Sequence, residues 1–138
     1  MAYGRGMATA TLGPIGYRTA VRSCGHELQA DEPRSAGGTD TGPTPMGLLL
    51  GALASCTAIT LRMYAERKGW PLSGVQVETS LAGSASVGGS GAQPHVLRTI
   101  TLTGDLDDEQ RARLADIAER TPVTRIVREG RPVSTTLR

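Results

Sequence analysis

The stretch PMGLLLGALASCTAITLRMYAERKGW, Pro45 to Trp70, decides the fold of this chain. The hydroxyl group of Thr44 can cap a helix, and Pro45 is well suited to the first helical position. Gly69 provides a natural stop, so we predict one long helix from Pro45 to about Lys68. The first half of this helix has no polar face, and a helix that is apolar all round is normally buried all round.

Short strands and two further helices are predicted around this long helix. A hairpin with its turn at Ser23-Cys24-Gly25 precedes it, and two strands and an edge strand follow it. The predicted strands are 17–21, 26–30, 74–82, 95–103 and 131–137. A second helix, capped by Asp105 or Asp107, buries Leu114, Ile117 and Ala118, and a short helix or turn covers 121–129. This order of elements predicts the α+β class.

Two loops stand out by composition. The segment ADEPRSAGGTDTGPTP leads into the long helix, and a loop of this length is usually functional or covers another part of the molecule. The segment GSASVGGSGAQP, residues 83–94, predicts a flexible connection between two strands.

The size and composition of the chain indicate a single domain. Its 138 residues include 18 Gly, no Phe, three Tyr and one Trp, so the core must be built from Leu, Ile, Val and Ala. We predict a flexible segment over 1–16 and one domain over 17–138. A core of small side chains suits a protein that completes its burial with a partner subunit.

Charge and hydropathy exclude several classes of protein. The 15 basic and 13 acidic residues are spread evenly, without the basic stripe and stacking aromatics typical of nucleic-acid binding. No secretory signal is apparent at the N-terminus. The apolar run from Met46 to Ile59 is too short to span a membrane, and Arg62 and Glu66 follow it. We therefore expect a soluble cytoplasmic protein with no nucleic-acid or membrane partner.

The chain has two cysteines, Cys24 and Cys56, and two histidines, His26 and His95. Two thiols in a cytoplasmic protein are more often free or redox-active than joined in a structural disulfide. The histidines lack the spacing of a metal site, and no second pair completes the cluster Cys24-Gly25-His26. No metal and no bound cofactor are predicted.

Cys56 admits two interpretations. Free cysteine is among the most buried residue types, so Cys56 can be a small core residue. Alternatively it is a nucleophile, which requires a lowered thiol pKa. Because Cys56 lies past the first turn, the helix dipole acts weakly on it, and a cation must come from elsewhere. Arg18 and Arg22 on the first predicted strand are the nearest candidates.

Several motifs resemble the OsmC/Ohr superfamily of bacterial hydroperoxide-reducing proteins, in its OsmC-like branch. They are DEP at 31–33, the loop GGTDTGPTP, ALASCTAITLRMYA with the following Trp-Pro-Leu, and LTGDLDDEQRARLADIAERTPVTRIV. The similarity covers most of the chain after Tyr17.

The resemblance implies an intertwined α+β homodimer, with strands wrapped around a long buried central helix in each subunit. It also implies that Cys56 attacks the peroxide oxygen and becomes a sulfenic acid, and that an external thiol or dithiol restores it. In the family an arginine and a glutamate orient the reacting groups, and a second cysteine just before a proline forms a disulfide with the first.

The sequence departs from that pattern at three places. Thr121-Pro122 stands where the family tends to have Cys-Pro, so the resolving thiol is missing from its usual site. Met46-Gly47 stands where the central helix usually begins with an acid, and Thr124 replaces a common histidine. Loss of the acid would leave the arginine less well oriented.

Other candidate residues have a structural and a functional alternative. Cys24 is either a turn cysteine without a role or an alternative resolving thiol, if the dimer brings it within disulfide distance of Cys56. Asp31 and Glu32 beside Pro33 more often shape a loop than transfer protons. Met46, Leu49 and Leu53 are core residues or the lining of a pocket for an alkyl group.

Two functional hypotheses follow. The first is a Cys56 peroxidase that reduces organic hydroperoxides to alcohols in oxidative-stress defence. The second is a catalytically degenerate dimer that binds a small apolar ligand, which the missing acid and thiol favour. A plain stress-associated structural protein explains Cys56 least.

Overall fold

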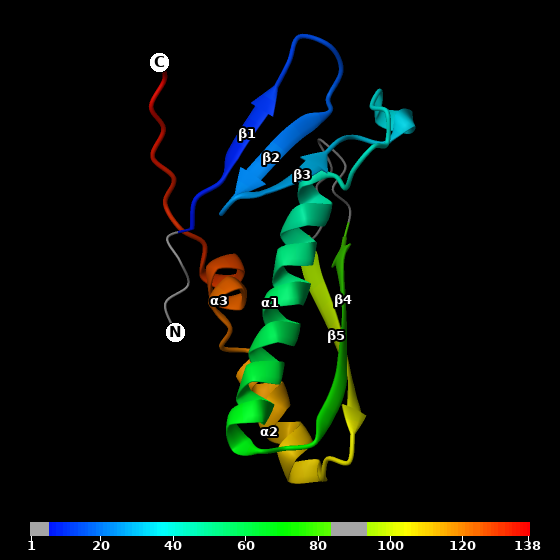
Figure 1. The fold of residues 1–138 in the computed structure, drawn as a ribbon, viewed down its shortest axis with the longest axis vertical. Coiled ribbons are helices and arrows are strands. Elements are labelled where there is room, and N and C mark those ends of the chain that lie inside the picture. Colours follow the sequence, from blue (N-terminus) through cyan, green and yellow to red (C-terminus); the bar gives the residue numbers. More distant parts are fainter. Residues whose placement is uncertain (1–5, 84–93) are drawn as a thin grey trace. The chain divides into compact units, whose positions relative to one another are not determined.

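The computed structural model describes residues 6–83 and 94–138, which divide at the start of the longest helix (Figure 1). One unit is Met1–Leu49 and the other is Leu50–Arg138. Each unit is described by itself below. Helices and strands occur in both parts of the chain in the predicted order, which confirms the α+β class.

The first unit is built on a three-stranded antiparallel sheet in the order β1-β2-β3. Its strands are β1 (Thr9–Leu12), β2 (Thr19–Ser23) and β3 (His26–Ala30). Strand β1, which pairs with β2, lies in the segment for which the sequence predicted flexibility. The predicted hairpin between β2 and β3 is confirmed, with Ser23 opposite His26.

The hairpin turn consists of Cys24 and Gly25, both with positive φ, at 51° and 81°. A two-residue turn of this kind matches the twist of the two strands it joins. Cysteine is an uncommon residue in this conformation, since a side chain there crowds the backbone.

The loop between β3 and the long helix contains the short 3₁₀ helix η1 (Arg34–Ala36) and is closely packed. A Cβ atom on Gly38 would lie 2.0 Å from the carbonyl oxygen of Glu32, and one on Gly42 would lie 2.2 Å from that of Gln29. Only glycine permits such close approach of two backbone segments. The loop folds back onto the end of the sheet, where Asp31 N donates to Pro43 O.

Helix α1 (Pro45–Lys68) has the bounds that the sequence predicted. The backbone N–H of Gly47 donates to the hydroxyl oxygen of Thr44 at 3.0 Å, which confirms the predicted cap. At the other end Gly69 has a φ of 70° and its N–H donates to Glu66 O. The local signals at both ends were therefore sufficient to place this helix.

The prediction that α1 is buried on all sides is wrong for the single chain. Its buried residues form one stripe at a spacing of four: Leu53, Thr57, Leu61 and Ala65. Ile59 is 52% exposed and Met63 is 39% exposed. One sheet and its flanking helices can cover only one side of a helix, so an apolar side of α1 is not covered by the described residues of the second unit.

By length and composition alone, helix α1 is long and apolar enough to cross a membrane. The apolar run considered in the sequence, from Met46 to Ile59, is only part of this helix, which continues beyond it to Lys68. The core helix of a soluble protein passes the same test. Its second half packs in the core of the second unit, and the guanidinium group of Arg62 donates to the carbonyl oxygen of Leu72.

The second unit adds a long antiparallel hairpin and two helices to α1. Its elements are β4 (Leu72–Ala82), β5 (His95–Gly104), α2 (Asp108–Ala118) and α3 (Pro122–Glu129). Asp107 caps α2 in a reciprocal arrangement with Gln110, which confirms one of the two predicted caps. The core comprises Leu61, Ala65, Leu72, Leu106, Leu114 and Ala118.

One predicted strand is wrong, and one predicted loop cannot be compared. Residues 131–138 form no strand, and Val133 and Leu137 are almost fully exposed. An alternating pattern does not make a strand without a neighbour to accept its backbone hydrogen bonds, and Pro132 has no N–H to offer. The predicted Gly/Ser loop over 83–94 lies mostly outside the described residues.

Candidate functional site

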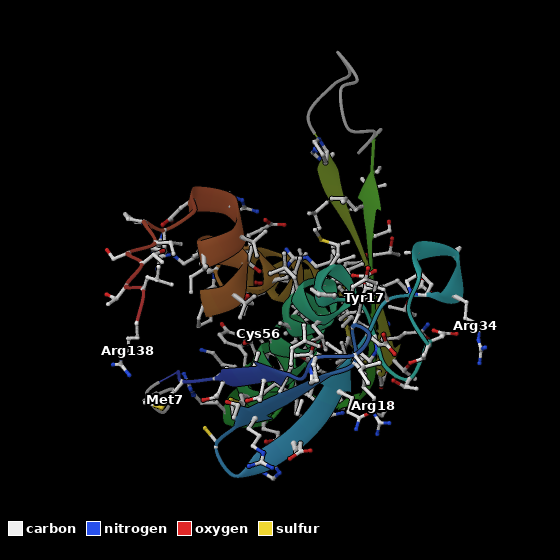
Figure 2. The ribbon with its side chains drawn as sticks, turned by 90° about the horizontal axis from the view of Figure 1, so that it is seen from above. Met7, Tyr17, Arg18, Arg34, Cys56 and Arg138 are labelled. Atoms are coloured by element: carbon white, nitrogen blue, oxygen red, sulfur yellow. The ribbon has the colours of Figure 1, made fainter. Side chains whose placement is uncertain are left out.

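Cys56 lies on α1 in the second unit, where Figure 2 labels it. Its side chain is half-buried and its thiol is free. Ser55 before it is exposed and Thr57 after it is fully buried, so Cys56 lies at the border between the covered and uncovered sides of the helix. A thiol at such a border is neither a sealed core residue nor fully solvated.

The hydroxyl group of Thr60 lies one turn after Cys56 on the same side of α1. Its oxygen is buried and has no hydrogen-bond partner within residues 6–83 and 94–138. A buried hydroxyl without a partner is uncommon and calls for an explanation. The hydroxyl makes no hydrogen bond to the Cys56 thiol, so a bond from Thr60 to a Cys56 thiolate is a prediction that needs a direct test.

The side chain of Arg98 on β5 connects Thr57 of α1 to Thr124 of α3. Its Nη1 atom donates to Thr57 Oγ1 at 3.0 Å and to Thr124 Oγ1 at 2.8 Å. Only 11% of this side chain is exposed. A guanidinium group so deeply placed requires hydrogen-bond acceptors, and the two threonines supply them.

Each hydroxyl hydrogen in this cluster can be assigned. Thr57 donates to Leu53 O at 2.7 Å and accepts from Arg98. Thr124 donates to Ala118 O at 3.2 Å, so in the 2.6 Å contact between Thr121 and Thr124 the donor is Thr121. The cluster is thus satisfied, which favours a single rigid arrangement.

Glu119, directly after α2, binds two arginines. Arg98 Nη2 lies 3.3 Å from its Oε1 atom, and Arg128 Nη2 contacts its Oε2 atom. The hydrogen bond from Arg128, helped by the charges of Arg98 and Arg128, lowers the pKa of Glu119 although partial burial opposes the shift. Because Arg98 and Arg128 share the one carboxylate of Glu119, the three side chains together carry a net positive charge.

This cluster borders an open hollow of about 630 Å³ in the second unit. The lining combines charged and apolar groups: Leu53, Pro94, His95, Val96, Leu97, Arg98, Glu119, Thr124, Val127 and Arg128. Of the three residues predicted to bind an alkyl group, Leu53 lies here. Met46 and Leu49 are in the first unit and are about half exposed.

The two arginines predicted to serve the thiol are bonded within their own sheet. Arg22 Nε lies 2.6 Å from Glu27 Oε2, and Arg18 Nε donates to Gln29 Oε1 at 2.8 Å. Figure 2 labels Arg18 in the first unit, whereas Cys56 belongs to the second. The assignment of either arginine to Cys56 stays a prediction.

Cys24 is exposed at the hairpin turn, where Ser23 Oγ lies 3.8 Å from its sulfur. A shallow hollow of about 430 Å³ surrounds it and is lined by Met7, Thr9, Arg22, Ser23, Gly25, His26 and Glu27. A role as resolving thiol stays a prediction, because Cys24 and Cys56 belong to different units.

Asp31 shapes the loop ahead of α1, as the sequence favoured. Its buried carboxylate accepts hydrogen bonds from the hydroxyl groups of Thr39 and Thr41 and from the backbone N–H groups of Glu32 and Thr41. The bonds from Thr39 and Thr41 lower the pKa of Asp31 far below its ordinary value. A carboxylate held in this way does not take up protons near neutral pH.

Comparison with known proteins identifies the family. The family described as OsmC-like protein matches residues 38–136, which is most of the chain. The chain belongs to the OsmC-like family. No curated protein sequence matches it.

Solved structures of OsmC and Ohr proteins share the fold. An OsmC-like protein from Mycoplasma pneumoniae matches with a TM-score of 0.77 at 15% identity, over 94% of this chain and 91% of the other. An organic hydroperoxide resistance protein OsmC from Legionella pneumophila has a TM-score of 0.66 at 23% identity, over 93% and 92%. The organic hydroperoxide resistance protein OhrB of Bacillus subtilis has a TM-score of 0.62 at 24% identity, over 94% of both chains.

Three residues of this OsmC-like chain stand at positions where the resemblance predicted other residue types, and each has a structural role. Thr121, at the place expected for a resolving cysteine, caps α3 by accepting from Thr124 N at 3.1 Å. Thr124, at the place of a common histidine, accepts from Arg98. Gly47, near the place of the expected acid, contributes only its backbone N–H to the helix cap.

Sequence reasoning missed Arg98, Thr57 and Glu119. Arg98 follows two apolar residues in a strand, and nothing local distinguishes it from a solvent-exposed arginine. One signal could have been used: side chains alternate between the two faces of a strand, so Arg98 shares a face of β5 with Val96 and Ile100. An arginine on the covered face of a strand needs acceptors from the elements packed on it.

Proposed function

We propose that this chain reduces organic hydroperoxides to alcohols in oxidative-stress defence, with Cys56 as its reactive thiol. The observation that carries the proposal is the free, half-buried thiol on α1 inside the segment that matches the OsmC-like family. The organic hydroperoxide resistance proteins of Legionella pneumophila and Bacillus subtilis, which share the fold, support it.

The first step is attack of the Cys56 thiolate on the terminal oxygen of the hydroperoxide ROOH. An S–O bond forms, the O–O bond breaks, and the sulfur is oxidised to a sulfenic acid while ROOH is reduced to the alcohol ROH. The departing alkoxide takes up a proton. The step requires a positive group that stabilises both the thiolate and the departing alkoxide.

The second step needs a thiol from outside the chain, because position 121 is a threonine. An external thiol attacks the sulfenic acid, releases water and leaves a mixed disulfide on Cys56. A second thiol, from the same dithiol or another molecule, reduces this disulfide and regenerates Cys56. This gives one-cysteine chemistry, with no bound cofactor.

The apolar surface of α1 supports two further parts of the proposal. Met46 and Leu49 expose apolar area suited to the alkyl part of the substrate, which hydrogen peroxide lacks. Ile59 and Met63 lie at spacings of three and seven from Cys56, on one side of the helix. We propose that this side packs against a second copy of the chain in a cytoplasmic homodimer.

A second candidate function is binding of a small apolar ligand without catalysis. Thr121, Thr124 and Gly47 favour it, since none of them supplies the thiol, imidazole or carboxylate expected at its position. The hollow beside Leu53 and Val127 would then be the ligand site.

Mixing reduced protein with cumene hydroperoxide in a stopped-flow instrument separates the two. The peroxidase proposal expects rapid consumption of one equivalent and a mass increase of one oxygen atom on Cys56. Cys56→Ser should abolish both, and Cys24→Ser should change neither. Equal and slow consumption by wild type and Cys56→Ser would instead favour the binding protein.

A further inference from the structure

We propose that Arg98 is a positioning residue for Cys56: it anchors the next residue of α1 to the start of α3 and places a cation at the turn of α1 that carries the thiol. This inference rests on the function proposed above. It assigns to β5 a role that the sequence predicted for Arg18 or Arg22.

The anchor is made by one nitrogen atom. Nη1 of Arg98 donates to Thr57 on α1 and to Thr124 on α3, and Thr121 and Ala118 complete the bonds of Thr124. Thr57 is fully buried and its hydroxyl also donates to Leu53 O. The turn of α1 that carries Cys56 is therefore held at its neighbouring residue.

The charge of Arg98 is only partly neutralised. The charged and titratable groups that line the hollow with it are Glu119 after α2, Arg128 on α3 and His95 on β5, while α1 contributes Leu53. Glu119 is about half exposed and is shared with Arg128. A nearly buried cation with a shared, partly solvated partner retains an electrostatic effect on its surroundings.

Position 98 requires the shape of the guanidinium group as well as its positive charge. Its planar group reaches two hydroxyls through Nη1 and a carboxylate through Nη2. A lysine ammonium keeps the charge but not this fork. Arg98→Lys and Arg98→Met therefore separate anchoring from charge.

The test is the pH dependence of Cys56 alkylation by iodoacetamide in the Cys24→Ser background, together with the rate of reaction with cumene hydroperoxide. Arg98→Met should raise the alkylation midpoint, because Arg98 binds Thr57 beside Cys56 and a cation at that place favours the thiolate. Arg98→Lys should keep the midpoint near wild type but slow the peroxide reaction. Arg125→Met, which removes an exposed arginine of α3, should change neither.

Two further variants keep the proposal testable if Arg98→Met does not fold. Glu119→Gln removes the shared carboxylate and should lower the midpoint, opposite to Arg98→Met. Thr57→Val should slow the peroxide reaction several-fold, and Thr57→Ser, which keeps the hydroxyl, should restore it. Midpoints equal to wild type in Glu119→Gln and in folded Arg98→Met would overturn the proposal.

The two proposals fail in different ways. If wild type reduces no peroxide but its alkylation midpoint still shifts in these variants, the proposed function is wrong and the role of Arg98 stands. If wild type reduces cumene hydroperoxide and the variants match it in both measurements, the role of Arg98 is wrong and the proposed function stands.

Discussion

The carboxylate of Asp31 accepts a hydrogen bond from the hydroxyl group of Thr39 at 2.6 Å. A second hydroxyl, from Thr41, lies 2.7 Å from the same oxygen atom. The loop that precedes α1 is thereby folded around one buried negative charge. This relationship explains why the loop contains Thr39 and Thr41.

We predict that Asp31→Asn destabilises the protein in a pH-dependent way. The pKa of Asp31 is lower in the folded chain than its ordinary value of 3.8, so the ionised carboxylate contributes stability above that value. This contribution to stability is lost as the pH falls from 3.8 toward the lower pKa of Asp31 in the folded chain. Urea unfolding of both proteins should show a clear gap in midpoint at neutral pH that narrows under acidic conditions. A gap of constant size from neutral to acidic pH would contradict this explanation.

Leu61→Ala tests the core of the second unit. Leu61 is fully buried among Ala65, Leu72 and Leu114. The substitution removes buried methyl groups and leaves a cavity, so it should cost about 3 kcal/mol of unfolding free energy. Chemical denaturation measures the loss, and Leu97→Ala, at a position that is 48% exposed, is the matched control expected to cost much less.

The elements that were predicted correctly are specified by residues that lie close to them in the sequence. Helix α1 is defined by Thr44 at one end and Gly69 at the other, and both act through backbone groups within a few residues. The hairpin turn at Cys24 and Gly25 is equally local. Such short-range contacts can be inferred from the spacing of residue types.

The candidate site was harder to predict because its contacts are long-range. Arg98 meets Thr57, 41 positions earlier, and Thr124, 26 positions later. No local pattern specifies such partners. The uncovered side of α1 has a similar cause: apolar residues all around a helix indicate burial, but not whether the same chain provides the cover. The motifs did identify the family, and Cys56 lies within the segment that matches it, but its role stays a prediction.

Ile59→Glu tests the proposed homodimer. Ile59 is an exposed apolar residue on the side of α1 that carries Cys56 and Met63. A carboxylate buried against a partner helix without a counter-charge should weaken the dimer at least about 100-fold. Sedimentation velocity over a range of concentrations should show a dimer for wild type and a monomer for the variant. Arg67→Glu, on the exposed last turn, is the charge control. A monomeric wild type would refute the proposal.

Thr60→Val tests the hydroxyl group that lies one turn after Cys56 on α1. The hydroxyl oxygen is buried without a hydrogen bond to any described residue, so an isosteric methyl group should leave stability unchanged or slightly higher. If the hydroxyl donates to the Cys56 thiolate, the same variant should react more slowly with cumene hydroperoxide. Loss of stability with an unchanged rate would show that the hydroxyl has a structural partner instead.

Thr121→Cys tests whether the missing resolving thiol can be restored. Three consecutive hydrogen bonds, through Thr124 and Arg98, connect the Thr121 side chain to Thr57, the neighbour of Cys56. A cysteine here would occupy the N-cap position of α3, and a helix N-terminus favours the thiolate. Loss of the threonine cap should cost about 1 kcal/mol.

One equivalent of cumene hydroperoxide should convert the Thr121→Cys variant to an intramolecular disulfide between positions 56 and 121. The sulfenic acid on Cys56 reacts with the new thiol and releases water, so mass spectrometry should find two hydrogen atoms fewer and no added oxygen. Thr121→Ser retains the hydroxyl cap and should keep the oxygen adduct, as wild type does. A stable adduct in the cysteine variant would mean that the Arg98 cluster holds α3 too rigidly, or too far away, for the two sulfurs to meet.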